Sequence, residues 1–370
     1  MARPDIGPDE IGAVHAVMES GWITQGAVVR ELEGAFARLC GTAHAVATNT
    51  GTAALHVALL GLGVGEGDEV ITTPLSCIAS ANPILFQGAR PVFADVDAET
   101  YNVEAPQIAK RITARTRAIL PVHLFGHPVD MDPLLELAAS AGLPVIEDAS
   151  QATGASYRGR RVGGFGRVGC FSLYANKIIT AGEGGMLVTD DEALAERMRA
   201  IRNFGQVPGE HFRHAFLGGN YKMTDVCAAI GRAQIGKIDH YIAARRGQVA
   251  ALNAALGGLA GPAGPIERLP SERPWASAAP FAYPVLFRCA GLRQRAEEAL
   301  HAAGIETRPF FSLITAEEPY RSMGYDPADT PVAADLVARG LYVSASPDLT
   351  HDDRAHVAET LAAVARTETR

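Results

Sequence analysis

Lysine is scarce in this 370-residue chain, so each lysine is a candidate for chemistry. Of the 33 Lys and Arg residues, four are lysines: Lys110, Lys177, Lys222 and Lys237. Only lysine carries an amine that can lose its proton and attack a carbonyl carbon. Lys177 follows the apolar stretch Gly169-Cys-Phe-Ser-Leu, which also holds Ser172. Apolar surroundings lower the pKa of an ammonium group, so a nucleophilic amine is predicted here; a solvated lysine at a strand end is the alternative.

Two other segments place polar groups at the ends of apolar stretches. Val145-Ile-Glu-Asp puts Asp148 at the carboxyl end of a predicted strand, where open α/β sheets bind ligands. Asn49-Thr-Gly-Thr-Ala-Ala-Leu follows a strand and opens a helix. Free N–H groups and hydroxyls at such a helix start favour an anion. An ordinary helix cap would explain either segment equally well.

Together these residues match the chemical needs of pyridoxal 5′-phosphate (PLP). Its phosphate needs a helix N-terminus and hydroxyls, its ring nitrogen a carboxylate, and its aldehyde a lysine. Thr52, Asp148, Ser172 and Lys177 supply these groups. The residues alone therefore predict an α/β enzyme with an anion site and a reactive lysine.

Other functional classes fit the sequence poorly. The net charge of −8 argues against sequence-independent nucleic-acid binding. The glycines of Gly61-Leu-Gly-Val-Gly-Glu-Gly follow a predicted helix, whereas a dinucleotide fingerprint follows a strand. His123 and His127 lack a third ligand, so no metal is expected. No apolar run reaches a membrane span, and no signal peptide is apparent, so we expect a soluble, cytoplasmic protein.

Strand-like and helix-like segments alternate through the first two-thirds of the chain, which predicts a mostly parallel sheet flanked by helices. The predicted strands are 44–48, 69–73, 91–96, 118–124, 144–147, 168–173 and 185–189. The predicted helices are 52–62, 78–87, 132–141 and 192–202.

The remainder of the chain predicts a second unit. A long helical pattern covers 223–256 with a break near Gly236, and a Gly- and Pro-rich loop follows over 257–280. Beyond it, strands at 281–287, 306–311 and 341–344 alternate with helices at 292–303, 333–340 and 352–366. We therefore expect a large domain over 1–235 and a smaller C-terminal α/β domain over 236–370, which includes the long connecting helix.

Several motifs, in order along the chain, resemble the DegT/DnrJ/EryC1/StrS aminotransferases. They are Gly21-Trp-Ile-Thr-Gln-Gly, Asn49-Thr-Gly-Thr-Ala-Ala-Leu-His, Gly67-Asp-Glu-Val-Ile, Glu147-Asp-Ala-Ser-Gln-Ala, Phe171-Ser-Leu-Tyr-Ala-Asn-Lys and Gly219-Asn-Tyr-Lys-Met-Thr-Asp. The resemblance implies a fold-type I, PLP-dependent transferase with a mostly parallel seven-stranded sheet. It also implies a homodimer that takes an amino group from a glutamate-like donor and acts mainly on nucleotide-linked keto sugars.

The resemblance assigns roles to individual residues. It makes Lys177 the internal-aldimine lysine and proton shuttle, and Asp148 the partner of the ring nitrogen. Gln151 is assigned to the phenolic oxygen of the cofactor. The phosphate cup is assigned to Gly51, Thr52 and Ser172, with Asn220 reaching it from the other subunit.

Within the family, Tyr174-Ala-Asn-Lys-Ile-Ile and Gly304-Ile-Glu-Thr-Arg-Pro look most like perosamine-synthase-type enzymes, which aminate a GDP-linked 4-keto-6-deoxy sugar. Arg308 and Lys222 are assigned to the sugar nucleotide by this likeness. The chain departs from the family where Cys77 replaces the usual ring-stacking aromatic residue and where Thr315 replaces a histidine.

Three alternatives stay open at this stage. The substrate is a 3-keto sugar or a keto-cyclitol in the first, and the reaction is a sugar dehydration in the second, although dehydrating relatives carry His at the Lys177 position. In the third, the protein is a PLP-fold ligand binder without turnover, against which the intact Lys177, Asp148 and phosphate cup argue.

Overall fold

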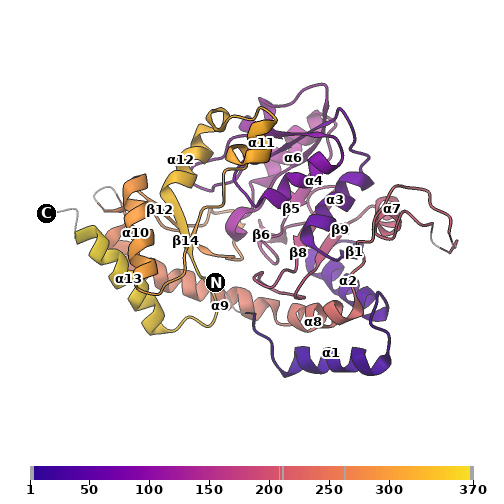
Figure 1. The fold of residues 1–370 in the computed structure, drawn as a ribbon, viewed down its shortest axis with the longest axis horizontal. Helices are drawn as coiled ribbons and strands as arrows, with labels where there is room; N and C mark the ends of the chain where they lie inside the picture. The colour runs from indigo at the N-terminus through magenta and orange to yellow at the C-terminus, as the bar shows by residue number, and fades with distance from the viewer. Residues whose placement is uncertain (1–3, 208, 211, 262–263, 367–370) are drawn as a thin grey trace.

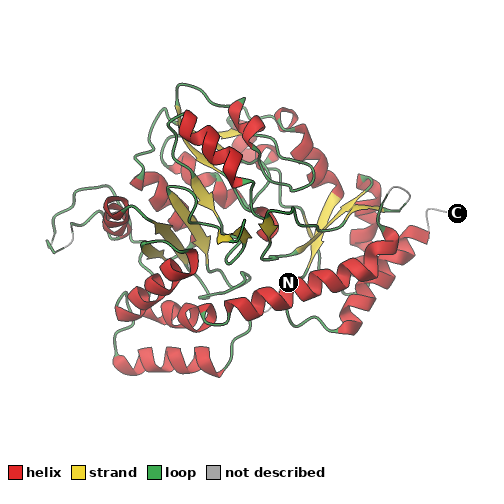
Figure 2. Cartoon of the chain, turned by 180° about the vertical axis from the view of Figure 1, so that it is seen from behind, coloured by secondary structure: helices red, strands yellow, loops and turns green. Residues whose placement is uncertain are grey.

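A central layer of strands lies between helices, and a smaller sheet with its own helices lies at one end (Figures 1 and 2). The computed structural model describes residues 4–207, 209–210, 212–261 and 264–366. Within these ranges, no helix is both long and apolar enough to cross a membrane.

The central layer consists of two sheets that meet edge to edge. The four-stranded sheet has the order β1 (His44–Thr48), β9 (Gly185–Thr189), β8 (Val168–Ser172), β5 (Ile146–Asp148). The three-stranded sheet has the order β3 (Arg90–Phe93), β2 (Glu69–Thr72), β4 (Thr116–Leu120). Parallel bridges from Ile119 to Val145 and from Val122 to Asp148 join them. β9 is antiparallel to both neighbours, while the pairs β5–β8, β2–β3 and β2–β4 are parallel.

Helices cover this layer because its strands are buried on both faces, as in β1, β8 and β9. The N-terminal helices are α1 (Pro8–Ser20), α2 (Ala27–Cys40), α3 (Gly51–Gly61), η1 (Ile78–Ser80), α4 (Asn82–Phe86), α5 (Ala105–Ala109), η2 (Leu124–Gly126), α6 (Met131–Ser140) and α7 (Glu192–Arg202). The helix expected over 78–87 is thus divided into η1 and α4, because the chain turns at Ala81 ahead of Pro83.

The C-terminal sheet is antiparallel throughout, with the order β10 (Ile266–Arg268), β12 (Tyr283–Phe287), β14 (Gly340–Val343), β13 (Arg308–Pro309). Its helical elements are α10 (Ala290–Ala302), η4 (Ile314–Ala316), α11 (Glu318–Ser322), η5 (Pro327–Asp329), α12 (Pro331–Arg339) and α13 (His351–Arg366). The region expected to be a loop, 257–280, contains η3 (Gly257–Leu259), β10 and β11 (Ala276–Ser277). β11 joins β6 (Ser156–Tyr157) and β7 (Arg160–Arg161) in a small separate sheet. β11 was missed because its pairing partner, β6, lies far away in sequence, whereas β6 and β7 pair locally and are only two residues long each.

The long helix α9 (Ile238–Leu256) runs from the central layer of strands to the C-terminal sheet, as Figure 1 shows. It follows α8 (Asp225–Ile235), and the predicted break falls at Gly236 and Lys237 between them. Near its start, Ile238 and Tyr241 pack into a core with α2 and β8. Near its end, Leu252 and Leu256 pack into the core of the C-terminal sheet.

Asp225 stabilises a helix that lies almost 200 residues earlier in the chain. Its carboxylate accepts hydrogen bonds from the backbone N–H groups of Gly26, Val28 and Val29 at 2.8, 3.3 and 3.0 Å. It is 3% exposed. These donors belong to the unpaired first turn of α2, so Asp225 acts as a remote N-cap.

Replacing Asp225 by Ala should therefore lower the free energy of unfolding by about 2 kcal/mol or more, because buried backbone donors lose a charged acceptor. Chemical denaturation of the two proteins measures the difference. Asp191→Ala is the matched control, since Asp191 caps α7 locally at a more exposed position. A loss no larger than that of the control would contradict the remote cap.

Candidate active site

The carboxyl ends of β5 and β8 bring Asp148 and the Lys177 segment together. Asp148 is the last residue of β5 and is 2% exposed. β5 and β8 are parallel, with Asp148 opposite Cys170, so the chain that leaves β8 at Ser172 begins on the same edge. The charge of Asp148 acts on Lys177. The two residues were predicted to share a site, and the parallel pairing explains why they do.

Lys177 lies in an apolar setting. Its Nζ is 4.5 Å from the centre of the Phe281 ring. Burial lowers the pKa of its ammonium group, and the nearby charges of Asp148 and Cys77 oppose that shift only in part. A lysine in this environment offers a larger fraction of free amine at neutral pH than a solvated one. Cys77 is exposed at the start of η1, close enough to act on Lys177.

Asp148 has hydrogen-bond donors on both carboxylate oxygens. Oδ1 accepts from the backbone N–H of Ser150 at 3.1 Å, and Oδ2 accepts from Ser80 Oγ at 2.7 Å. Ser80 was not among the residues predicted for the site. The sequence signal available was the four-residue spacing of Ser76 and Ser80 just after a strand, which is weak alone.

The residues predicted to form the anion cup lie at or beside the start of α3. Thr50 caps α3, its Oγ1 accepting from Ala53 N at 3.0 Å. Gly51 packs directly on Ser172: a Cβ at Gly51 would lie 2.8 Å from Ser172 Cβ. Thr52 follows in the first turn of the helix. The three predicted cup residues are therefore contiguous in space, and glycine is required at 51.

Gln151 faces the opposite part of the site. Its Oε1 accepts from the backbone N–H of Phe125 at 3.0 Å, and the residue is 4% exposed. Phe125 has a φ of 53°, a left-handed conformation that costs energy for this residue type. The hydrogen bond from Phe125 fixes the Gln151 carboxamide with its NH₂ group as the remaining donor.

Arg308 lies on the C-terminal sheet, beside the Lys177 segment. It is exposed in β13 and pairs with Glu306 at 2.9 Å. With Asn176, Phe281 and Tyr342 it lines one hollow. Phe281 is the ring against Lys177 Nζ, so the hollow adjoins the lysine. Asn176 Oδ1 is buried, and it has no hydrogen-bond partner within the part of the chain that the structure describes. Phe281 and Asn176 were not singled out from the sequence, and Phe281 reaches the site only through tertiary packing.

Asn220 and Lys222 belong to a segment that contacts Asn49, just before the predicted cup: Asn49 Nδ2 donates to Asn220 O at 3.5 Å, and Asn49 N donates to Tyr221 O at 2.8 Å. Asn220 is exposed and pairs through its backbone with Asn203. Lys222 Nζ donates to Asn203 Oδ1 at 2.9 Å and lies 4.4 Å from the Phe204 ring centre. Burial and the positive charge of Arg202 lower its pKa. Within the described part of the chain, no hydrogen bond or ion pair joins either residue to Lys177.

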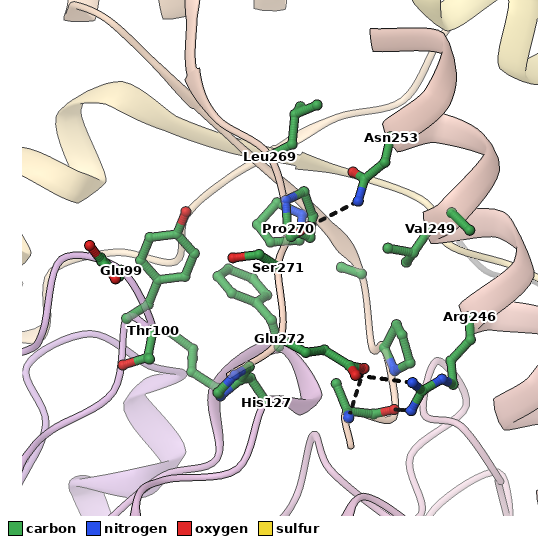
Figure 3. A pocket seen from close by; sticks show the side chains of 18 residues that line it. Glu99, Thr100, His127, Arg246, Val249, Asn253, Leu269, Pro270, Ser271 and Glu272 are labelled. Carbon is green, nitrogen blue, oxygen red and sulfur yellow. Dashed lines mark hydrogen bonds and ion pairs between the residues drawn. The ribbon is translucent and has the colours of Figure 1, made fainter. Parts of the chain in front are cut away.

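A second cavity of about 260 Å³ lies between α9 and the segment 269–272, apart from Lys177. Figure 3 shows Arg246 and Asn253 of α9 on one side and Glu272 on the other. Arg246 and Glu272 form an ion pair of 3.0 Å. The described residues contain no group of three or more His, Cys, Asp or Glu side chains suited to a metal ion.

Comparison with known proteins agrees with this geometry. The model of the DegT/DnrJ/EryC1/StrS aminotransferase family matches residues 4–362. The chain belongs to this family. It is a PLP-dependent sugar aminotransferase, as the resemblance implied.

Individual family members are similar over nearly their full length. GDP-perosamine synthase of Caulobacter vibrioides is 40% identical over 356 residues, covering 95% of this chain and 94% of that protein. GDP-perosamine synthase of Escherichia coli O157:H7 is 36% identical, covering 97% and 96%. The crystal structure of S. venezuelae DesV in complex with a ketimine intermediate has a TM-score of 0.89 at 34% identity, covering 96% and 94%.

The environment of Lys177 predicts the pH dependence of its reactivity. The amine should become reactive at a pH below the ordinary lysine value, because burial lowers its pKa. Competitive acetylation of the PLP-free protein over a range of pH, followed by mass spectrometry, gives the pH midpoint at which the Lys177 amine becomes reactive. In Asp148→Asn the midpoint should fall further, since the opposing carboxylate is gone. Asp352→Asn on α13 is the control; a Lys177 midpoint at or above the ordinary value would contradict the interpretation.

Proposed function

We propose that this family member moves an amino group from a glutamate-like donor to a nucleotide-linked 4-keto-6-deoxy sugar, with Lys177 as the catalytic residue. The observation that carries the proposal is the desolvated Lys177 amine, which lies within the electrostatic reach of Asp148 and beside a hollow that Arg308 lines. The 40% identity to a GDP-perosamine synthase supports a GDP-linked sugar.

The residues present fit PLP. The close packing of Gly51 on Ser172 puts the Ser172 side chain beside the first turn of α3, where backbone N–H groups and hydroxyls favour a phosphate. Asp148 has one donor on each oxygen, and a carboxylate has about four acceptor positions. It therefore retains acceptors for a protonated ring nitrogen. The buried, unpartnered Asn176 Oδ1 next to Lys177 is a further group that a ligand would satisfy.

When bound, PLP supplies an electron sink for the reaction. Lys177 would hold the cofactor, and its free amine would serve as the general base and acid of the reaction. Asp148 would hold the ring nitrogen. The Gln151 NH₂ group would be the donor available to the phenolic oxygen, because the carbonyl oxygen of Gln151 accepts from Phe125 N. Arg308 binds the diphosphate of the sugar nucleotide through its guanidinium.

The active enzyme is proposed to be a homodimer with shared sites. Asn220 and Lys222 follow α7 in the chain, and both pair with Asn203: Asn220 through its backbone and Lys222 through its Nζ at 2.9 Å. The segment 203–222 exposes Phe204 at 48% and Leu217 at 88%. Large exposed apolar side chains next to functional residues are typical of subunit interfaces. On the partner, Asn220 would then complete the phosphate cup and Lys222 would face the sugar nucleotide.

The proposal extends to the fold. The two central sheets, joined by their parallel bridges, correspond to one seven-stranded sheet of the fold-type I arrangement. The C-terminal sheet and its helices form the smaller domain, with the boundary placed near residue 235, between α8 and α9.

A substrate other than a 4-keto sugar remains the second candidate. Thr315 is 2% exposed, and its Oγ1 has no hydrogen-bond partner among the described residues, at the position where relatives were expected to carry histidine. Cys77, which lies near Lys177, takes the position where relatives were expected to carry a ring-stacking aromatic residue. Both differences lie where specificity can change, which favours testing a 3-keto sugar or a keto-cyclitol in parallel.

The reaction is tested by absorption spectroscopy. L-glutamate should abolish the visible band of the PLP-loaded protein, and the correct keto sugar should restore it. We expect restoration with GDP-4-keto-6-deoxymannose and not with dTDP-4-keto-6-deoxyglucose. Lys177→Ala should show neither change, while Lys110→Ala, an exposed position, should behave as wild type. Restoration only by a 3-keto sugar or a keto-cyclitol would overturn the substrate assignment.

The shared site is tested by mixing subunits. Lys177→Ala and Asn220→Ala should each lose activity when pure. After unfolding and refolding together in equal amounts, half of the dimers are mixed and each mixed dimer holds one intact site. Activity should therefore return to about a quarter of wild type. No recovery on mixing, with dimers confirmed by sedimentation, would mean that Asn220 acts within its own subunit.

A further inference from the structure

A short chain of hydrogen bonds reaches Asp148 from the side of η1. Ser80 Oγ lies 2.7 Å from Asp148 Oδ2, and Ser76 Oγ lies 3.0 Å from Ser80 Oγ. The three residues are 1–2% exposed. Such a relay is absent from the roles that the resemblance assigned, and it connects the loop after β2 to the end of β5.

The chemistry of the three groups fixes the direction of the relay. An ionised carboxylate only accepts hydrogen bonds, so Ser80 must donate its single hydroxyl proton to Asp148. Ser80 can then only accept from Ser76, which makes Ser76 the donor of the second bond. Both protons point toward Asp148, so the two hydroxyl dipoles stabilise its negative charge cooperatively.

We propose that Ser80, supported by Ser76, is a positioning residue that holds the Asp148 carboxylate oriented toward the PLP ring nitrogen. The inference rests on the proposed function, since it assigns Asp148 to that nitrogen. Ser80 and Ser150 bind one oxygen each, which prevents rotation of the carboxylate. The remaining acceptor positions are thereby held in a fixed direction.

Packing alone does not explain two serines here. Buried hydroxyls cost free energy unless they are hydrogen-bonded, and alanine would fill most of the same space without that cost. The hydroxyls of Ser76 and Ser80 are both hydrogen-bonded, because their series of hydrogen bonds ends at the Asp148 carboxylate. Without Ser80, only the Ser150 backbone N–H holds the carboxylate, which can then rotate and make a weaker hydrogen bond to the ring nitrogen. The cofactor then becomes a weaker electron sink.

The test uses PLP labelled with ¹⁵N at the ring nitrogen, bound to full-length protein. In Ser80→Ala the ¹⁵N signal should move toward that of an unprotonated ring, and the Kd for PLP should rise. We expect kcat to fall roughly tenfold, the effect of losing one hydrogen bond to a charged group, with less change in the KM for the keto sugar. Ser76→Ala should show the same changes at smaller size.

Ser346→Ala is the matched control, because Ser346 is a buried serine distant from Asp148 in the chain and 3% exposed. A Ser80→Ala protein with the ¹⁵N signal and Kd of that control would overturn the proposal. If Ser80→Ala does not fold, Ser76→Ala decides: it leaves the Ser80–Asp148 contact in place, and an unchanged ¹⁵N signal overturns the relay. Wild-type protein that binds PLP but aminates no keto sugar would contradict the substrate assignment, while the ring-nitrogen signal would still decide the relay.

Discussion

The candidate active site depends on the hydrogen bonds that one buried carboxylate accepts. Glu147, the residue before Asp148, is fully buried. It accepts hydrogen bonds from the backbone N–H groups of Gly163, Phe165 and Gly166, each at 2.7 Å, and contacts His123 Nε2 at 3.2 Å. Burial alone would raise the pKa of Glu147, but the contacts with His123 and the backbone donors hold it below its ordinary value. The charge is therefore kept, and it fixes the loop that leads into β8.

This arrangement divides the strand end into two faces. Neighbouring residues in a strand point to opposite faces, so Glu147 holds the loop on one side while Asp148 meets Ser80 and Lys177 on the other. Because the Gly163–Gly166 loop precedes β8, the Glu147 carboxylate also sets where the Lys177 segment leaves the sheet. Asp148 is thus placed directly by its strand, and the segment that carries Lys177, the proposed catalytic residue, is placed through the loop.

Local sequence patterns predicted the parts that depend on local forces. β1, β9 and α7 have the predicted bounds, and the break before α9 falls at Gly236 as expected, because strand patterns and helix caps act over a few residues. The proximity of Asp148, Ser172 and Lys177 was predictable, because each lies at or just after the carboxyl end of a predicted strand. Features made by distant contacts were missed. The start of α2 is capped by Asp225 from far along the chain. Ser80 joins the site only through its hydrogen bond to Asp148. The C-terminal strands pair antiparallel with partners that are not adjacent in sequence.

The helix α9 contributes apolar side chains to two hydrophobic cores at once. Ile238 and Tyr241 belong to the core beneath the active site, while Leu252 and Leu256 belong to the core of the C-terminal sheet. A gene cut after codon 235 would leave the first fragment with an uncovered apolar groove and the second with a helix whose leading turns have nothing to cover them. Separate expression of the halves thus calls for overlapping fragments that both carry α9, and an exchange of homologous modules at either end of this helix would remove apolar side chains from one of the two cores.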